Sequence, residues 1–319
     1  MSDFHEFLDL PFFEEEHRRL VDGLEELIHE RVLPLEEEAE SEREQSRAIV
    51  DVLAEEGWLD YAVPSEYGGV HESLDVRSLC LCRATLARHS GLADFAFAMQ
   101  GLGSGPISLF GSDALREHYL PRVRRGEAIA AFALSEREAG SDAAAIKTSA
   151  ERRGGDYELN GEKTWISNAG LADFYVVFAR ETDPEIDGIS AFVVEAEDDG
   201  FEFVEAIETV SPHPLGTIAF DECRIPAERR IGPAGGGFKV ALATLDVFRS
   251  TVGAAATGFA RAAFEETLEH VTEREVFGQR LADFQMTKND LAEMATELDA
   301  ASLLVFRSAW KKDDGAERV

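Results

Sequence analysis

The spacing of apolar residues changes twice along this chain, and these changes constrain its fold more than any other feature. From residue 16 to residue 88 apolar side chains recur at helical intervals. Across residues 128–231 they form short runs or alternate with polar residues, as strands do. From residue 235 onward the helical spacing returns. We therefore predict an α+β, mainly α chain with three domains. They are an N-terminal all-helical domain (1–125), a middle antiparallel β domain (126–232) and a C-terminal helical bundle (233–319).

The middle segment carries the most specific local signals. The dipeptide Asn160-Gly161 separates two alternating stretches, which predicts a short hairpin turn there. A Gly- and Ser-bearing loop, residues 135–142, follows an apolar run, and Trp165 and Ser167 stand near the end of a strand. Because loops beside rigid strands commonly carry binding residues, we expect a ligand here. The G-x-G-x-x-G signature of a Rossmann domain is absent from the sequence.

Residues 101–106 read GLGSGP and form another glycine-rich stretch. They lack the GK[ST] ending of a phosphate-binding loop, and no strand-like segment precedes them. We predict a joint between two helices that borders the ligand cleft.

The chain is strongly acidic, with 63 Asp and Glu against 31 Lys and Arg and a formal net charge of −32. Only 6 of the basic residues are lysine. This balance predicts a halophilic protein, because concentrated salt screens the repulsion among carboxylates. An ordinary acidic cytoplasmic protein is the alternative.

Composition also disfavours several classes of protein. An acidic surface without a basic stripe argues against nucleic-acid binding. No apolar run of about 18 residues and no signal-like N-terminus occurs, so we expect no membrane insertion and a cytoplasmic location. Cys80, Cys82 and Cys223 have neither a disulfide framework nor zinc-ligand spacing, and we expect no metal.

The last helical segment carries a seven-residue apolar repeat at Phe284, Leu291, Leu298 and Val305. The helix expected over residues 238–271 is apolar around much of its circumference. A two-helix hairpin covers only one stripe on each helix. We therefore expect a homo-oligomer or a partner chain to cover the rest.

Three motifs give the chain a resemblance to a known family. They are LSE at 134–136 with AGSD at 139–142, NGEKTWISN at 160–168, and REVFG at 274–278 with Gln285. In this order, and over essentially the whole chain, they resemble the acyl-CoA dehydrogenase family of FAD-dependent enzymes. From the resemblance alone we expect the chain to lack the C-terminal part of that family's helical bundle.

The resemblance implies an FAD site. The backbones of Phe132 and Leu134 and the hydroxyl of Ser135 would meet the flavin ring, and Ser141 would reach the pyrophosphate. Trp165 would pack beside the flavin, and Ser167 would donate near N5. These residue types suit a flavin, which needs stacking area and a few fixed donors. If the resemblance did not hold, Trp165 would be read as β-domain core and the serines as turn formers.

Other positions match family contacts less specifically. Arg274, Phe277 and Gln285 resemble contacts to the FAD of a neighbouring subunit, where an arginine fork suits a pyrophosphate. Asp246 and Arg249, with Ser141, match positions that line the acyl-thioester channel. An ordinary surface ion pair is an equally good reading of Asp246 and Arg249.

The catalytic residue stays unknown. The family removes the α hydrogen of an acyl thioester as a proton with a carboxylate while the β hydrogen leaves as hydride. In a minority of members the carboxylate lies where this chain has Phe248, and in the majority it would fall beyond Val319. We therefore expect the 319-residue chain alone to have little turnover.

The leading hypothesis is an FAD-dependent acyl-CoA dehydrogenase-like oxidoreductase that transfers hydride to flavin N5, with an electron-transfer flavoprotein as acceptor. It would act on an acyl-CoA, by itself or with a partner chain that completes the bundle. One alternative is a dehydrogenase of acyl groups bound to a carrier protein. The other is a non-catalytic flavin-binding or structural subunit.

Overall fold

The structure is a computed structural model that describes residues 7–38, 41–186, 188–211 and 213–316. The chain forms two compact units. The helical unit comprises Met1–Pro34, Asp75–Asp94 and Val247–Val319, and the sheet unit comprises Leu35–Leu74 and Phe95–Asp246. These units divide the chain differently from the three predicted domains, whose boundaries stay predictions.

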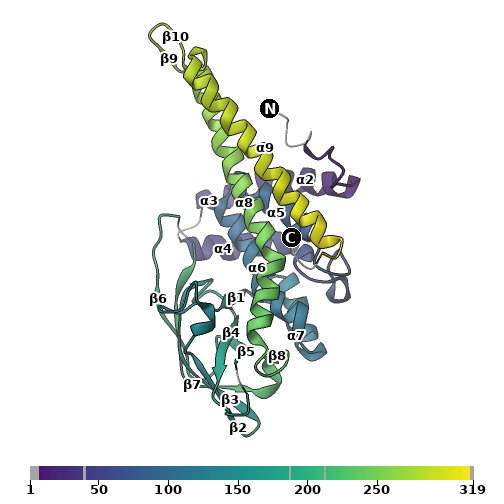
Figure 1. The fold of residues 1–319 in the computed structure, drawn as a ribbon, viewed down its shortest axis with the longest axis vertical. Coiled ribbons are helices and arrows are strands. Elements are labelled where there is room, and N and C mark those ends of the chain that lie inside the picture. The colour runs from purple at the N-terminus through teal and green to yellow at the C-terminus, as the bar shows by residue number, and fades with distance from the viewer. Residues whose placement is uncertain (1–6, 39–40, 187, 212, 317–319) are drawn as a thin grey trace. The chain divides into compact units, whose positions relative to one another are not determined.

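Helices fill most of the chain on both sides of the strand-rich segment, as predicted (Figure 1). The α-helices are α2 (Glu15–Leu27), α3 (Leu33–Glu38), α4 (Glu42–Glu55), α5 (Val76–His89), α6 (Gly91–Phe110), α7 (Asp113–Arg124), α8 (Gly237–Glu273) and α9 (Gln285–Asp313). A π-helical turn, Ile28–Val32, joins α2 to α3. Short 3₁₀ turns are Trp58–Ala62, Ser65–Tyr67, Ala143–Ala145, Ala227–Arg229 and Leu281–Asp283. Ser41 and Ser112 cap α4 and α7 by accepting amide hydrogens of the first turn.

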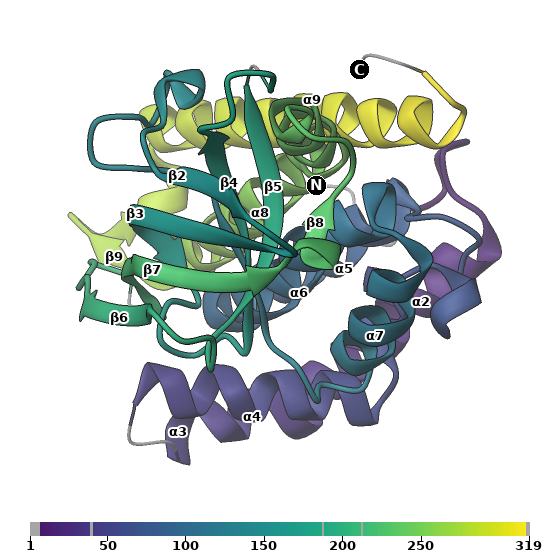
Figure 2. The same ribbon diagram turned by 90° about the horizontal axis from the view of Figure 1, so that it is seen from below.

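The strands of the sheet unit form one eight-stranded sheet (Figure 2). They are β1 (Ala130–Ala133), β2 (Ser149–Arg153), β3 (Asp156–Ser167), β4 (Phe174–Glu181), β5 (Ile189–Glu195), β6 (Phe201–Ala206), β7 (Leu215–Pro226) and β8 (Arg230–Ile231). The order is β6-β7-β3-β2-β4-β5-β8, and β1 pairs with β4. The prediction of an antiparallel sheet holds for most pairs but is wrong for two, because β1 and β2 both pair with β4 in parallel.

The expected hairpin at Asn160-Gly161 is wrong. Both residues lie inside the twelve-residue strand β3, and the turn that joins β2 to β3 falls at Gly154-Gly155. Gly161 has φ +141° and lies at a register shift against β7, which is a β-bulge. A Cβ there would lie 2.8 Å from the Cα of Thr148, so a side chain has no room. The dipeptide therefore bends a strand instead of ending one.

The expected joint at residues 101–106 is also wrong, because α6 runs through it without interruption. Gly103 allows α6 to pack closely against β1, because a Cβ at this position would lie 2.6 Å from the Cβ of Ala130. One turn earlier, the fully buried Gln100 donates from Nε2 to the Ala128 carbonyl (3.0 Å) and accepts from the Ala130 amide (2.9 Å). Its side chain thus supplies hydrogen bonds along β1 that a neighbouring strand would otherwise make.

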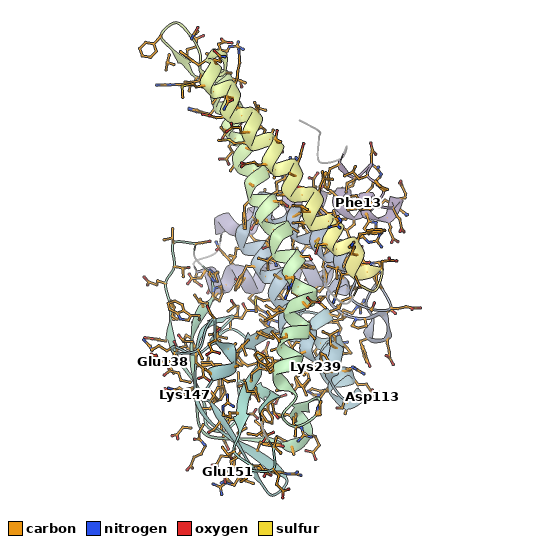
Figure 3. The ribbon with its side chains drawn as sticks, viewed as in Figure 1. Phe13, Asp113, Glu138, Lys147, Glu151 and Lys239 are labelled. Atoms are coloured by element: carbon orange, nitrogen blue, oxygen red, sulfur yellow. The ribbon has the colours of Figure 1, made fainter. Side chains whose placement is uncertain are left out.

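In the helical unit, aromatic rings join the two ends of the chain. Phe13, labelled in Figure 3, stacks edge-on against Phe306 of α9 with centroids 5.1 Å apart. Asp313, at the end of α9, accepts from the amides of Val76 and Arg77 at the start of α5. A carboxylate at a helix N-terminus is favourable because amides there lack partners within the helix.

An apolar groove of about 630 Å³ runs between α8 and α9 and is lined by residues including Ala260, Phe264 and Leu298. Val252, Phe259 and Leu304 nearby are 59%, 47% and 65% exposed. Of the repeat predicted on α9, Leu298 and Val305 line this groove, and Leu298 is buried. On α8, the exposed Val252 and Phe259 agree with the apolar surface predicted for that helix. Within the described residues, no helix is both long and apolar enough to cross a bilayer.

Candidate active site

A cavity of about 520 Å³ opens in the sheet unit where β1 and β3 end. The six residues predicted from the sequence to contact FAD in this region all line it: Phe132, Leu134, Ser135, Ser141, Trp165 and Ser167. They come from two segments of the chain that the sheet brings together. The structure therefore gathers both sequence motifs around one pocket.

Trp165 owes its place to an irregularity in β3. Its φ is +60°, in a region that bulky residues rarely adopt, and the pairing of β3 with β7 shifts register between Lys163 and Ile166. The indole is 60% exposed, so it is not core of the β domain. Strain of this kind collects at ligand sites, and here it presents a large flat ring at the pocket.

Asn168, at the end of the same segment, also has positive φ (+62°) and is buried. Its side-chain amide donates to the Ala130 carbonyl at 3.0 Å. It fixes β1 against the end of β3, whereas Gln100 holds the start of β1 against α6. The two motif-bearing walls are thus tied to each other by the buried amide of Asn168.

A buried ion pair supports the pocket loop that follows β1. Lys163 is fully buried, and its Nζ donates to the Leu134 carbonyl (3.0 Å) and to Glu136 Oε1 (2.8 Å). The Glu136 carboxylate also accepts from the amides of Lys147 (2.6 Å) and Thr148 (2.9 Å). Neither member of this pair was a candidate site residue from the sequence.

The pKa values of Lys163 and Glu136 depend on their mutual hydrogen bond and on burial. Burial lowers the pKa of the Lys163 ammonium to about 8, although the hydrogen bond to Glu136 opposes the shift. Burial alone would raise the pKa of Glu136, but hydrogen bonds from Lys163, Thr148 and Lys147 outweigh it and lower that pKa. The carboxylate is therefore ionised at neutral pH.

Sequence reasoning missed most of the pocket lining that comes from helices; only the stretch 101–106 was predicted to border the ligand cleft, and its Leu102 does line the pocket. Met99 and Leu102 of α6 and Phe238, Leu242 and Leu245 of α8 line it. Apolar helical residues of this kind look like ordinary core positions in a sequence. Only the glycines at 235–237, the last of which begins α8, marked a nearby break in the pattern.

Several predicted residues do not line this pocket. Asp246 and Arg249 lie on α8, at the end of the sheet unit and in the helical unit respectively, and neither is part of the lining. Phe248, also on α8, is buried at 5% exposure and offers no proton acceptor. Their predicted roles stay predictions.

The third motif lies in the helical unit, at the β9–β10 hairpin (Glu275–Val276 and Gln279–Arg280) that joins α8 to α9. Phe277 has φ +52° and is 98% exposed, and Arg274 and Gln285 are also exposed. An exposed phenylalanine at a tight turn is compatible with contact to another molecule. The FAD contacts predicted for these three residues stay predictions.

Comparison with known proteins decides the family. Three family models match: acyl-CoA dehydrogenase N-terminal domain (residues 14–127), middle domain (131–223) and C-terminal domain (235–318). A probable acyl-CoA dehydrogenase, fadE25 of Mycobacterium leprae, is 37% identical over 96% of this chain and 79% of its own. The chain belongs to the acyl-CoA dehydrogenase family.

Solved structures of the family have the same fold. Butyryl-CoA dehydrogenase from Megasphaera elsdenii matches with a TM-score of 0.86 and 30% identity, over 95% of this chain and 81% of that one. An acyl-CoA dehydrogenase complexed with FAD from Bacillus anthracis matches with a TM-score of 0.87 and 33% identity, over 93% of this chain and 51% of that one. The predicted fold class is confirmed, and the chain is an FAD-dependent oxidoreductase of this family.

The pocket residues fit a flavin. Trp165 and Phe132 supply aromatic surface, and the hydroxyls of Ser135, Ser141 and Ser167 make no hydrogen bond to the described part of the chain. Three free hydroxyls beside two aromatic rings match a ring system that is flat, apolar on its faces and polar along its edge. A Cβ on Gly140, which lines the pocket, would meet no atom within 4 Å, so the loop has open space at this position.

Proposed function

We propose that this chain serves the α,β-dehydrogenation of an acyl-CoA, with FAD seated in the pocket between β1, the end of β3 and the first turns of α8. No described residue of the chain is assigned as the carboxylate that takes the α proton, so a partner chain that supplies it is part of the proposal. The observation that carries the proposal is the convergence of Phe132, Leu134, Ser135, Ser141, Trp165 and Ser167 on one cavity. When bound, FAD supplies the hydride acceptor at N5. The protein's own share is to bind, orient and shield the reacting groups.

Each wall of the pocket has a distinct task in this proposal. Trp165 offers its exposed ring for stacking, and Ser167 places a hydroxyl at the same strand end. Ser135 and Ser141 provide hydroxyls from the loop after β1. Phe238 and Leu242 make the facing wall apolar, which suits an acyl chain and keeps water from the reacting carbons.

The partners complete the proposal. An electron-transfer flavoprotein is the proposed acceptor, and Asp246, Arg249 and Ser141 are proposed contacts of the thioester. Arg274, Phe277 and Gln285 are proposed to reach the FAD of a neighbouring subunit, which makes the protein a homo-oligomer or a complex with a partner chain.

The test is FAD titration followed by anaerobic mixing with a panel of acyl-CoAs. We expect tight FAD binding, a visible flavin spectrum, and a spectral change with at least one acyl-CoA. Trp165→Ala should weaken FAD binding about two- to tenfold, the range of one aromatic stack. Trp310→Ala, on α9 and outside the pocket lining, is the matched control. A protein that takes up no FAD, or whose flavin responds to no acyl-CoA, contradicts the proposal.

A further inference from the structure

Lys163 is the only lysine among the fully buried large side chains of the described residues. Its neighbours along β3 are Thr164, buried, and Trp165, exposed at the pocket. A buried ion pair adds little net stability compared with an apolar pair of similar volume, because both charges lose hydration. Stability alone therefore does not explain why a charge occupies this position.

The partners of Lys163 explain it better. One is the carbonyl of Leu134, a residue of the pocket wall, and the other is the carboxylate of Glu136, which starts the loop. Between them stands Ser135, whose carbonyl accepts from the Thr164 amide at 3.1 Å. Adjacent residues of β3 thus hold two residues of the pocket wall, Leu134 and Ser135, and Glu136 directly after them.

Glu136 extends this support to the far end of the loop. Its two oxygens accept from the amides of Lys147 and Thr148, eleven and twelve residues later. Its backbone exchanges two hydrogen bonds with Ala139, each 3.1 Å. The loop between these points includes Ser141 and the other residues of this pocket wall, so one carboxylate closes the loop at its base.

We propose, building on the function proposed above, that Lys163 is a positioning residue of the cofactor pocket. Its buried ammonium holds the Leu134 carbonyl and the Glu136 carboxylate so that Ser135 and Ser141 face the bound FAD. The Leu134 carbonyl also lies in the same peptide unit as the Ser135 amide. A charge-assisted hydrogen bond to that carbonyl polarises the peptide unit and makes the Ser135 amide a stronger hydrogen-bond donor.

The test uses Lys163→Met, which removes the ammonium and keeps the length of the side chain. FAD affinity should fall about ten- to a hundredfold, the range for losing a hydrogen bond to a charged group. The visible circular dichroism of the bound flavin should also change, because the wall beside the ring is no longer fixed. Lys147→Met is the matched control: Lys147, labelled in Figure 3, is exposed, and only its backbone amide contacts Glu136.

A double variant separates positioning from stability. In Lys163→Met with Glu136→Gln no uncompensated charge is left, so the urea midpoint of the FAD-free protein should recover toward that of the wild type. FAD affinity should not recover, since the Leu134 carbonyl still lacks its donor. Recovery of both quantities would show a merely structural pair and overturn the proposal.

Glu136→Gln alone keeps the proposal testable if Lys163→Met does not fold. It retains one carbonyl oxygen for three donors, so FAD affinity should fall at least about threefold. Wild-type affinity in Glu136→Gln, or in a folded Lys163→Met, would refute the positioning role. If the wild type and Lys147→Met take up no FAD, the proposed function fails instead, so the two failures are distinct.

Discussion

Replacing Gln100 with leucine tests how the pocket strand is held. Gln100 is fully buried, and its amide satisfies the Ala128 carbonyl at 3.0 Å and the Ala130 amide at 2.9 Å. In Gln100→Leu both backbone groups stay buried without partners, at about 1–3 kcal/mol each. The two groups together cost about 2–6 kcal/mol, and apolar burial of the leucine returns about 2 kcal/mol. We expect a net loss of about 2 kcal/mol in the free energy of unfolding, within a range of about 0–4 kcal/mol.

Urea unfolding followed by far-ultraviolet circular dichroism, at one fixed salt concentration, measures this loss. The midpoint should fall without a change of slope, since the surface exposed on unfolding is the same. FAD affinity should fall as well, because β1 carries Phe132 into the pocket. Gln279→Leu, on the exposed β10 strand, should stay within about 0.5 kcal/mol of the wild type. Equal midpoints for the two variants would refute the role given to Gln100.

Four further results are expected. Gly103→Ala should lower the free energy of unfolding in urea by about 1–3 kcal/mol, because the new Cβ would lie 2.6 Å from that of Ala130. This clash outweighs a helix-propensity gain of about 1 kcal/mol. The control Gly155→Ala, with open space around it, should not lower it. The pKa of Lys163 is about 8 in the folded protein against 10.5 for a free lysine, so between these pH values the unfolded chain binds more protons than the folded one. Stability should therefore rise with pH from about 8 to about 10.5. Lys163→Met should abolish this rise. Stability should fall as pH drops below about 4.5, because the pKa of Glu136 is lowered in the folded state, and Glu136→Gln should flatten that fall. The melting temperature should increase strongly between 0.01 M and 1 M salt, where the screening length shrinks from about 30 to about 3 Å, and an unchanged value would count against a halophilic protein.

The spacing of apolar residues and the order of the sequence motifs predicted much of this structure. The long helices and the strand-rich middle segment follow from the spacing of apolar residues, which depends only on local geometry. The pocket residues on β1, on the loop after it and at the end of β3 were predicted from the motifs that resemble the acyl-CoA dehydrogenase family. By contrast, Met99 and Phe238 are brought to the pocket by packing between distant segments, and nothing in their local sequence marks them.

The two wrong local predictions have a common cause. Asn160-Gly161 and residues 101–106 contain glycines, which were interpreted as chain breaks. In the structure Gly161 lies against Thr148 and Gly103 against Ala130, so each glycine permits close contact inside a continuous element. A sequence shows that a side chain is missing but not which neighbour requires its absence. The actual turn lies at Gly154-Gly155, between the end of β2 and the start of β3.

The burial of Lys163 and the exposure of Trp165 could not be predicted from the sequence. From hydrophobicity alone, the tryptophan would be expected inside and the lysine outside. In the structure Lys163 is completely buried and Trp165 is 60% exposed. The register shift after Lys163 turns the strand, and the acceptors at Leu134 and Glu136 make the buried ammonium tolerable. Such an inversion is costly for folding, so it is expected where a site needs an exposed ring and a fixed wall together. The Lys163 and Trp165 variants should therefore weaken FAD binding by different routes, one through the loop and one through stacking.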